Sequence, residues 1–338
     1  MFIYVHNLYI LVNMDYTVGL QEKIKSEDTF DGIIGRSKLM KELKSKIELA
    51  AENDLTVLIS GESGTGKELV ARSIHKRSNR ASGPFVTLNS GAMAKDLVPS
   101  ELFGHERGAF TGATELKNGV FESANNGTLF LDELSSMDYK TQTSLLRVLE
   151  NKEFRRVGGK KTFVTTARIL TATNRNLQDL IKEGKFRKDL YYRFEVFIIS
   201  VPPLRKHWED IADMVRVFIN DFNRELGKNI KKVPKETMDY LIKYDWPGNV
   251  RELRNNIQRA MMFAKGTRLL PEHLPKRLLD HNPQKKHLDI EIGLPLHDVE
   301  KRYIERTLWW LGGNKLKTAK ALGISRRALY NKIEEYNI

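Results

Sequence analysis

The stretch LISGESGTGKE, which runs from Leu58 to Glu68, decides the fold of this chain. It places a glycine-rich loop directly after a short apolar strand and before a helix, which we expect over Glu68–Arg77. The loop has three glycines, Gly61, Gly64 and Gly66. They let backbone N–H groups turn inward around phosphate oxygens, and the N-terminus of the helix favours an anion. Lys67 completes the spacing GxxxxGK and reaches the β- and γ-phosphates, so the stretch predicts nucleotide binding.

Acidic residues for a metal ion and for an attacking water follow further along the chain. The residue after Lys67 is Glu68, where a Ser or Thr hydroxyl usually helps to hold Mg²⁺, so the ion depends on water or on other carboxylates. GTLFLDEL, residues 127–134, supplies Asp132 and Glu133 at the end of a strand, where ligands bind in open α/β sheets. We expect Asp132 to hold Mg²⁺ and Glu133 to polarise the attacking water. A solvated acidic turn is the alternative.

Two further stretches are weaker signals by themselves. LTATN, residues 170–174, ends an apolar run in Thr173 and Asn174. These polar groups suit the sensing of a γ-phosphate, although such residues more often cap the next helix. FRKDLYYRF, residues 186–194, is a basic stretch whose arginines are most simply solvated.

Apolar runs that alternate with helical stretches organise most of the chain. The runs are LTVLIS, PFVTLNS, GTLFLDEL, ARILTATN and FEVFIISVPP. Strands that alternate with helices predict an α/β fold with a parallel sheet covered on both faces. Beyond the double proline the patterning is helical and is interrupted by one polar linker. The expected parts are a leader over 1–29, an α/β subdomain over 30–203, a helical subdomain over 204–279, a linker over 280–295 and a helical C-terminal domain over 296–338.

Composition narrows the class of protein. The chain has 338 residues, of which 41% are hydrophobic, so it is globular and long enough for two or three domains. Its net charge of +13 suggests a polyanionic partner. It has no cysteine, which excludes disulfides, thiolate metal sites and cysteine nucleophiles and fits a reducing compartment.

The N-terminal run MFIYVHNLYILVNMDYTV does not predict a membrane span. It is short, is interrupted by His6 and Asn7, and has no basic segment before it. We expect a frayed or packed leader, or a segment upstream of a true start at Met14; a short membrane-touching anchor is the less favoured alternative. No other run approaches a membrane-spanning length, so we expect a soluble, cytoplasmic protein.

The C-terminal stretch GGNKLKTAKALGISRRALYNKIEEY predicts two helices around a short turn. Lys317–Ala321 carry the first helix, Gly323 suits the turn, and Ser325 caps the second helix. Apolar contacts between the helices are expected from Leu316, Ala319, Leu322, Leu329 and Ile333. The candidate DNA contacts in the major groove are Ser325, Arg326, Arg327, Tyr330, Asn331 and Lys332. An amphipathic helical hairpin with a solvated basic face is the alternative.

A short loop without charge or metal ligand separates the phosphate loop from the acidic pair. It reads GAFTGA and consists of Gly108, Ala109, Phe110, Thr111, Gly112 and Ala113. An isolated stretch of this kind is a tight surface turn. Small residues also let a loop pack closely and move, while Phe110 offers an apolar anchor and Thr111 a hydrogen bond to a partner.

In combination these stretches resemble a known family. GESGTGKE, ELFGHERGAFTGA, GTLFLDEL, FRKDLYYRF, WPGNVREL and the closing helix-turn-helix resemble the AAA+ ATPases that activate sigma-54 RNA polymerase, the bacterial enhancer-binding proteins. The resemblance runs from about Phe30 to the C-terminus. It implies an AAA+ P-loop α/β subdomain, a helical lid and a Fis-like DNA-binding domain. A glutamate after the P-loop lysine is usual in that family, so Glu68 is compatible with ATPase activity.

The resemblance also implies roles for individual residues. ATP would be held by Gly61, Glu62, Ser63, Gly64, Thr65, Gly66, Lys67, Glu68 and Arg251, the last as sensor II on the lid. Asn89 is similar to the asparagine that holds the catalytic glutamate, and Asn174 to sensor I. Arg187 and Arg193 resemble arginine fingers that act on the ATP of the neighbouring subunit. The GAFTGA loop would touch sigma-54, and Glu153–Lys161 resembles the second pore loop.

Partners follow from these roles. The resemblance implies sigma-54 and RNA polymerase, double-stranded upstream DNA, and a homo-hexamer assembled from dimers, because a site shared between subunits requires a closed ring. Since so few residues precede Phe30, we expect control by a separate regulatory protein, or constitutive activity. A generic AAA+ remodeller and a DNA-binding repressor are the alternatives, and the intact GAFTGA and acidic pair favour neither.

Overall fold

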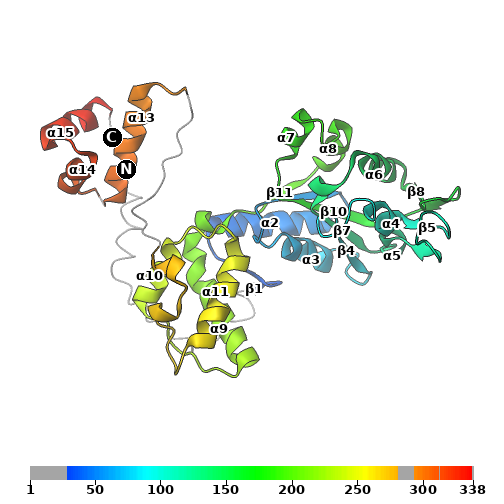
Figure 1. The fold of residues 1–338 in the computed structure, drawn as a ribbon, viewed down its shortest axis with the longest axis horizontal. Coiled ribbons are helices and arrows are strands. Elements are labelled where there is room, and N and C mark those ends of the chain that lie inside the picture. The colour runs from blue at the N-terminus through cyan, green and yellow to red at the C-terminus, as the bar shows by residue number, and fades with distance from the viewer. Residues whose placement is uncertain (1–28, 281–292, 312, 337–338) are drawn as a thin grey trace. The chain divides into compact units, whose positions relative to one another are not determined.

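A five-stranded sheet organises the α/β part of the chain (Figure 1). Its strands are β3 (Val57–Ser60), β4 (Phe85–Asn89), β7 (Thr128–Asp132), β10 (Arg168–Thr173) and β11 (Ile198–Ser200). Their order is β11-β3-β10-β7-β4 and every neighbouring pair is parallel. The five strands fall in the five apolar runs, so the predicted parallel α/β sheet is confirmed.

The computed structural model describes residues 29–280, 293–311 and 313–336. The chain divides into two compact units, Met1–His281 and Asn282–Ile338. Residues 1–28 of the expected leader, including Met14, and residues 281–292 of the expected linker lie outside the described residues. Among the described residues, every helix is too short or too polar to cross a bilayer.

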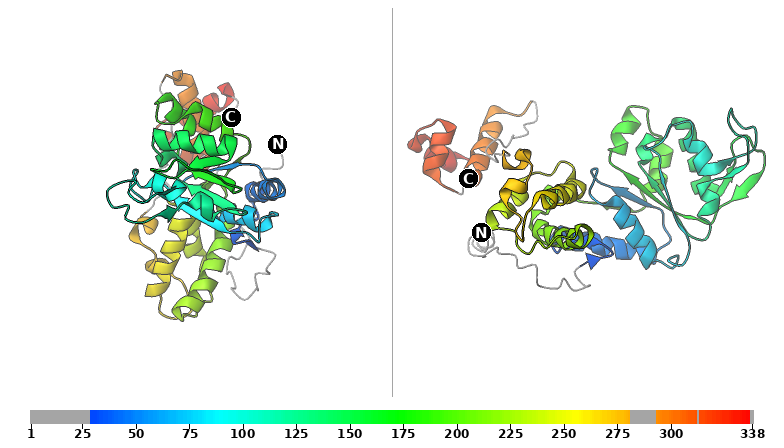
Figure 2. Two further views of the ribbon diagram at one scale, coloured as in Figure 1. Left: turned by 90° about the vertical axis from the view of Figure 1, so that its right-hand side faces the viewer. Right: turned by 60° about the horizontal axis from the view of Figure 1, so that its bottom comes forward.

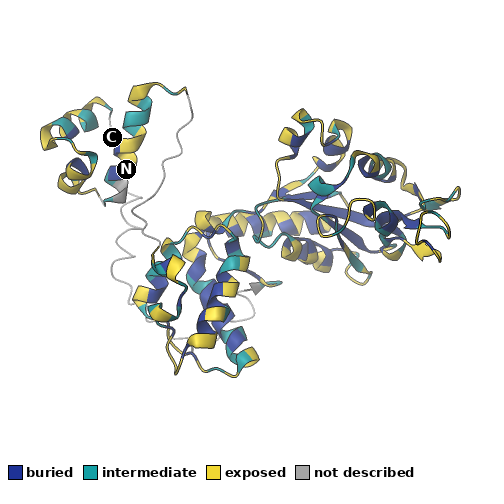
Figure 3. Ribbon diagram, in the orientation of Figure 1, coloured by how far each residue is buried: buried dark blue, intermediate teal, exposed yellow. Residues whose placement is uncertain are grey.

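Helices cover the sheet, and its central strands are buried (Figure 3). Successive strand residues point to opposite faces and belong to two apolar clusters. Leu129, Leu131 and Ile169 pack on one face, against the side that carries α4 (Val98–Phe103), α5 (Val120–Ser123), α6 (Tyr139–Asn151), α7 (Leu177–Lys182) and α8 (Lys188–Phe194). Phe130 and Leu170 point to the opposite face, covered by α2 (Lys38–Glu52) and α3 (Lys67–Arg77). Both faces are therefore buried, as in other parallel sheets.

A small hairpin, which the sequence analysis did not predict, precedes α2. It pairs β1 (Thr29–Phe30) with β2 (Ile33–Ile34) around Asp31 and Gly32, whose φ angles are 53° and 90°. An Asp-Gly pair with two positive φ angles is the turn that a two-residue hairpin favours, so this dipeptide was the missed signal. Asp31 accepts bonds from Ser73, Lys76 and Arg77, which fix the hairpin on α3.

Two short antiparallel hairpins extend the α/β part beyond the sheet. One pairs β5 (Gly104–His105) with β6 (Lys117–Asn118), and the other pairs β8 (Glu153–Arg155) with β9 (Thr162–Val164). GAFTGA lies between β5 and β6, and Glu153–Lys161, the expected second pore loop, starts on β8 and turns toward β9. The hairpins thus hold both loops at their bases.

The lid is helical, as the sequence predicted. It consists of η3 (Leu204–Lys206), η4 (Trp208–Asp210), α9 (Ile211–Leu226), α10 (Lys235–Lys243), α11 (Asn249–Phe263), η5 (Pro271–His273) and α12 (Lys276–Leu279). Figure 2 shows α9 and α11 side by side. Trp246 is fully buried in the lid core, and its indole N–H donates to Leu241 O over 2.7 Å. The indole thus adds apolar area without leaving a buried donor unpaired.

The second unit contains three helices, α13 (Leu296–Trp310), α14 (Lys315–Leu322) and α15 (Arg326–Glu335). Gly323 ends α14 with φ 67°, and the Ser325 hydroxyl accepts from Ala328 N, as expected of a turn and a cap. Ala319 and Leu329 are buried, but Leu316 is 51% exposed, so its predicted core contact is wrong. Leu316 lies roughly a third of a turn away from the buried face of α14.

Candidate active site

The phosphate loop connects β3 to α3. Gly64 and Gly66 adopt φ angles of 78° and 97°, which side chains rarely tolerate. The Lys67 ammonium folds over the loop and donates to the carbonyls of Gly61 and Glu62 over 2.9 and 3.0 Å. Burial lowers the pKa of Lys67. The ammonium can exchange these carbonyls for phosphate oxygens without leaving the loop.

The acidic pair lies at the carboxyl end of β7, on the same edge of the sheet. Asp132 ends the strand and is the register partner of Asn89, which ends β4. The Asn89 amide accordingly donates to Asp132 Oδ2 over 3.4 Å, and among the described residues it makes no hydrogen bond to Glu133. The expected bond between Asn89 and Glu133 is thus not formed here, because register places Asn89 beside Asp132.

Glu133 is held in an unusual backbone conformation. Its φ of 56° is left-handed, which costs a residue with a side chain about 1 kcal/mol or more. Its carboxylate lies against Gly91, where a Cβ would collide with it. The Glu133 carboxylate has no hydrogen-bond donor among the described residues, so it can bind a water.

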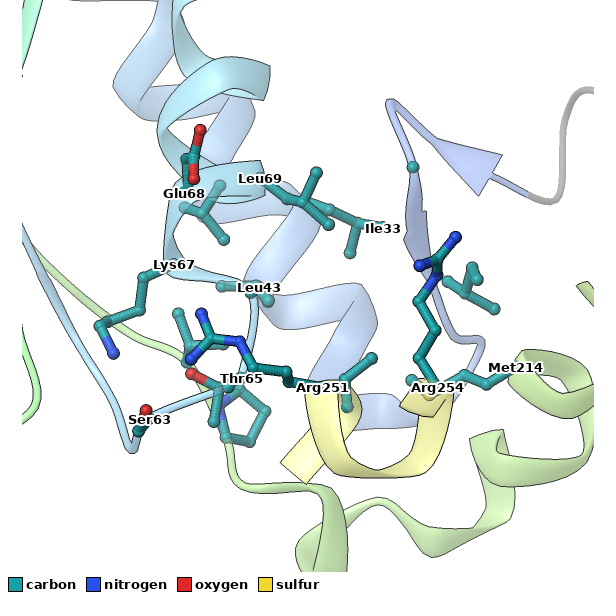
Figure 4. A pocket seen from close by; sticks show the side chains of 18 of the residues that line it. Ile33, Leu43, Ser63, Thr65, Lys67, Glu68, Leu69, Met214, Arg251 and Arg254 are labelled. Carbon is teal, nitrogen blue, oxygen red and sulfur yellow. The ribbon is translucent and has the colours of Figure 1, made fainter. Parts of the chain in front are cut away.

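A cavity of about 700 Å³ joins the phosphate loop, the acidic pair and the lid. Asn174, which follows β10, lines it together with Asn89, and Arg251 reaches it from α11. In Figure 4 the Arg251 guanidinium extends from the lid helix toward the side where Lys67 lies. Arg254 extends from the same helix beside Ile33. At the apolar end, the cavity is lined by Ile33, Ile34, Leu43, Met214 and Phe218.

This arrangement fits a nucleoside triphosphate with Mg²⁺. The cavity has an apolar end for a base, a glycine loop for phosphates, and cations from Lys67 and Arg251. Asp132 Oδ1 accepts from Glu133 N, and its other oxygen has only the long contact from Asn89. One carboxylate beside phosphates is how proteins commonly hold Mg²⁺. No cluster of three metal-binding side chains occurs in the part of the chain that the structure describes.

Two P-loop carboxylates that the sequence assigned to ATP form ion pairs with arginines, although Glu68 also lines the cavity. Glu68 lies on α3 and binds Arg72, with N–O distances of 2.9 and 2.7 Å. Glu62 binds Arg205 at the start of the lid. Ser63 and Thr65 line the cavity with the loop glycines, so their predicted contacts with phosphate remain compatible with their positions.

The two predicted arginine fingers are paired within their own chain. Arg187 binds the Asp189 carboxylate over 2.6 and 3.0 Å and donates to Thr143 Oγ1. Arg193 binds Glu150 over 2.9 Å. Neither lines the cavity of its own subunit. Each guanidinium thus already has an acidic partner within its own chain.

The GAFTGA loop is closed by a hydrogen bond from Gly108 N to Ala113 O of 2.8 Å. The Phe110 ring is 40% exposed and meets the His105 ring edge-on at 5.0 Å. Thr111 is exposed. The tip of the loop therefore presents one aromatic ring and one hydroxyl to a partner.

Arg156 links this loop to the second pore loop. It binds both oxygens of Glu122 and one of Glu106, and its guanidinium lies 4.4 Å from the centre of the Phe163 ring. Burial by itself raises the pKa of Glu122, but the hydrogen bonds from Arg156 and Gly119 N together with the charges of Arg156 and Lys161 outweigh it and lower that pKa. The sequence analysis identified the loop Glu153–Lys161 but did not predict these contacts, because the spacing of the residues shows no helical or strand periodicity.

Most of the predicted DNA contacts are on the surface of α15. Arg326, Arg327, Tyr330 and Asn331 are exposed, and Ser325 caps the helix. Lys332 differs, because its ammonium binds Glu300 of α13 over 2.7 Å. A phosphate contact by Lys332 would have to replace that ion pair.

Comparison with known proteins agrees with this geometry. Models of the Sigma-54 interaction domain, the AAA+ ATPase lid domain and the bacterial regulatory protein Fis family match residues 33–200, 205–290 and 295–336. Regulatory protein AtoC of Escherichia coli (strain K12) is 42% identical over 325 residues, which cover 94% of this chain and 70% of AtoC. Transcriptional regulatory protein ZraR of Escherichia coli O157:H7 is 44% identical over 303 residues, which cover 89% and 68%.

A solved structure is similar as well. The crystal structure of NtrX from Brucella abortus in complex with ADP has a TM-score of 0.71 and 36% identity, and the match covers 90% of this chain and 70% of NtrX. The sheet, phosphate loop and lid define an AAA+ P-loop ATPase. The chain belongs to the sigma-54-dependent transcriptional activators, in which this ATPase is joined to a Fis-type helix-turn-helix domain.

Proposed function

We propose that this chain hydrolyses ATP to drive its GAFTGA loop against sigma-54 and so opens the promoter complex of RNA polymerase, while its C-terminal domain holds it on upstream DNA. One observation carries the proposal. The same α/β unit combines a complete phosphate loop and acidic pair with a GAFTGA loop whose Phe110 and Thr111 face outward. The proposed domain limits are those expected from the sequence, and the proposed location is the cytoplasm, where RNA polymerase acts.

The chain's own residues divide the chemistry between them. Mg²⁺, when bound, offsets the charge of the phosphates, and Asp132 is the residue that would hold it. Lys67 transfers its hydrogen bonds from the loop carbonyls to phosphate oxygens. Glu133 accepts a proton from the attacking water at its free carboxylate. Asn174 and Arg251 face the same cavity and sense whether the γ-phosphate is present.

We further propose that the active site is completed in a hexameric ring. Arg187 and Arg193 are turned away from the cavity of their own subunit, which suits action on a neighbour. An arginine supplied from a neighbour stabilises transition-state charge and raises the rate by about 10³-fold or more. Dilution below the assembly threshold should therefore lower the ATPase activity per subunit. Activity that stays constant over a wide range of dilution contradicts shared sites.

A native gel with purified sigma-54 tests the central claim. ADP with aluminium fluoride, a mimic of the transferring phosphate, should produce a slow-migrating complex, and Thr111→Ala should abolish it with ATP hydrolysis changed less than about threefold, because Thr111 lies at the loop tip away from the cavity. Asp179→Asn, on the exposed face of α7, is a matched control. ATP hydrolysis without any such complex would instead favour a remodeller or repressor with another partner.

We propose that double-stranded DNA binds to α15. Arg326 and Arg327 lie in its first turn and are exposed, and such arginines contact guanine edges and phosphates in the major groove. Asn331 and Tyr330 extend the same exposed surface. Lys332 is the least suited of the predicted contacts, because Glu300 already neutralises it.

A further inference from the structure

The Glu62 side chain points from the phosphate loop to the lid. Its carboxylate binds both terminal nitrogens of Arg205, with N–O distances of 2.7 and 2.5 Å. Arg205 lies in η3, the first turn of the lid after β11. This bidentate geometry fixes direction as well as distance, which a single hydrogen bond would not. The second residue of the phosphate loop is therefore a contact to the lid.

Asn249 makes the same connection from the other side. Its amide nitrogen donates to Glu62 Oε2 over 3.2 Å and to Ser63 O over 3.0 Å, while its Oδ1 accepts from Leu204 N over 2.9 Å. Asn249 is fully buried and has a φ of 51°, a conformation that asparagine tolerates better than most residues. It begins α11, the helix that carries Arg251.

Backbone contacts also join the phosphate loop directly to α11. Arg251 N donates to Gly64 O over 3.2 Å, and a Cβ on Gly64 would collide with Gly248 O. Arg251 is thus only two residues from Asn249 and is attached through its own amide to the phosphate loop. Any shift of the lid relative to the loop moves Arg251 relative to the phosphates.

A second attachment lies at the other end of the segment that joins sheet and lid. Asp210 accepts from the backbone N–H of Arg36 and Ser37 over 2.7 and 2.9 Å and binds His207. It is 2% exposed, whereas the Glu62 and Arg205 side chains are each 41% exposed. Water therefore reaches the ion pair between Glu62 and Arg205 but not Asp210, so this ion pair is the more easily exchanged of the two attachments.

We propose that Glu62, Arg205 and Asn249 form a clasp that positions Arg251 over the phosphate loop, so that nucleotide affinity depends on Arg205 although it does not line the cavity. They are positioning residues, and the inference rests on the proposed role of Arg251. The Arg205 hydrogen bond lowers the pKa of Glu62 to about 2, so the clasp stays charged at every pH at which the protein is handled.

Binding of a non-hydrolysable ATP analogue to the full-length chain tests the clasp. Arg205→Gln and Glu62→Gln should each raise Kd about tenfold, and the double variant should raise it no more than the larger single change, because both remove one interaction. Arg205→Lys keeps the positive charge but loses the bidentate contact with Glu62, so it should raise Kd less than Arg205→Gln does. Glu183→Gln breaks a similar exposed pair with Lys185 and should leave Kd unchanged.

The decisive measurement repeats Arg205→Gln in an Arg251→Ala background. There its effect on Kd should fall below about twofold, because the residue that it positions is gone. An undiminished tenfold effect, or an unchanged Kd in Arg205→Gln alone, overturns the clasp. If Arg251→Ala by itself leaves Kd unchanged, the proposed role of Arg251 fails, and the clasp as its positioner fails with it.

The melting temperature without nucleotide should differ by only a few degrees among these variants. If Arg205→Gln unfolds early, Glu62→Gln replaces it in both measurements.

Discussion

The chain contains two glycine-rich loops that are built in opposite ways. In the phosphate loop, a Cβ at Gly64 would meet the backbone of the lid, and one at Gly61 would lie 3.0 Å from Val201 O. In the GAFTGA loop, a Cβ at Gly108 or Gly112 would meet nothing within 4 Å, although both residues have positive φ. One loop needs glycine for space and for conformation, and the other needs it for conformation alone.

We call the phosphate loop the held loop, because the surrounding elements fix it, and the GAFTGA loop the presented loop, because its tip is exposed. The phosphate loop is enclosed by β11, α3 and the lid, so its N–H groups are fixed before a ligand arrives, which is what tight anion binding requires. The GAFTGA loop is closed by local backbone bonds, from Gly108 N to Ala113 O and from Ala113 N to Phe110 O, and Phe110 also contacts the His105 ring. Its glycines are surrounded by open space, so its tip has room to change position when the nucleotide state changes.

The largest effect is expected from filling the held loop. Gly64→Ala adds a methyl group against Gly248 O and places a side chain at φ 78°. Overpacking and left-handed strain together cost about 2 to 4 kcal/mol, which should raise the Kd for ATP by about 30-fold or more. Fluorescence titration with labelled ATP measures this. Binding within threefold of the wild type contradicts the description of a held loop.

A smaller effect is expected from the hairpin that is attached to α3 behind the phosphate loop. Burial alone raises the pKa of Asp31, but hydrogen bonds from Lys76, Ser73 and Arg77 outweigh it and lower that pKa to about 2. Because the folded-state pKa is below the usual 3.8, the stabilisation is present above pH 3.8 and is lost as the pH falls toward 2. Asp31→Asn should therefore lower the free energy of unfolding at pH 7 by about 2 kcal/mol.

Urea unfolding at pH 7 and at pH 3 checks this pH dependence. The difference between wild type and Asp31→Asn should shrink at the lower pH, because the wild-type carboxylate then loses part of its advantage. Asparagine tolerates the left-handed φ of this position, so the variant removes charge without adding backbone strain. A difference that is equal at both pH values would assign the effect to packing instead of charge.

Local sequence patterns predicted the strands and the nucleotide-binding motifs better than the long-range contacts that fix these motifs in place. The five strands, the phosphate loop and the acidic pair each arise from a run of adjacent residues. The strands form one sheet, and the phosphate loop and the acidic pair lie together at its carboxyl edge. The contact of Glu62 with Arg205 joins residues 143 positions apart, and nothing in either stretch indicates the other. Asn249 was also missed, because a left-handed residue inside GNVREL looks like ordinary helix.

The sequence also failed to predict which side chain a given residue binds. Asn89 was assigned to Glu133 by resemblance, but the parallel register pairs it with Asp132. Lys332 was assigned to DNA from the polar side of its helix, but α13 supplies Glu300 to it. Helix and strand periodicity predict which side a residue faces, whereas the neighbour on that side depends on how separate elements pack.

The smallest effect is expected from Gly112→Ala in the presented loop. The added methyl group enters open space, so only the left-handed strain at φ 103° remains, about 1 to 2 kcal/mol within the loop itself. The strain can be relieved by movement of the tip, so the melting temperature should change by less than about 2 °C and nucleotide affinity by less than twofold. Differential scanning fluorimetry with and without ATP measures both quantities beside Gly64→Ala. An equal loss of ATP binding in the two variants would mean that the GAFTGA loop is as tightly coupled to the nucleotide site as the phosphate loop, and the distinction between held and presented loops would then be wrong.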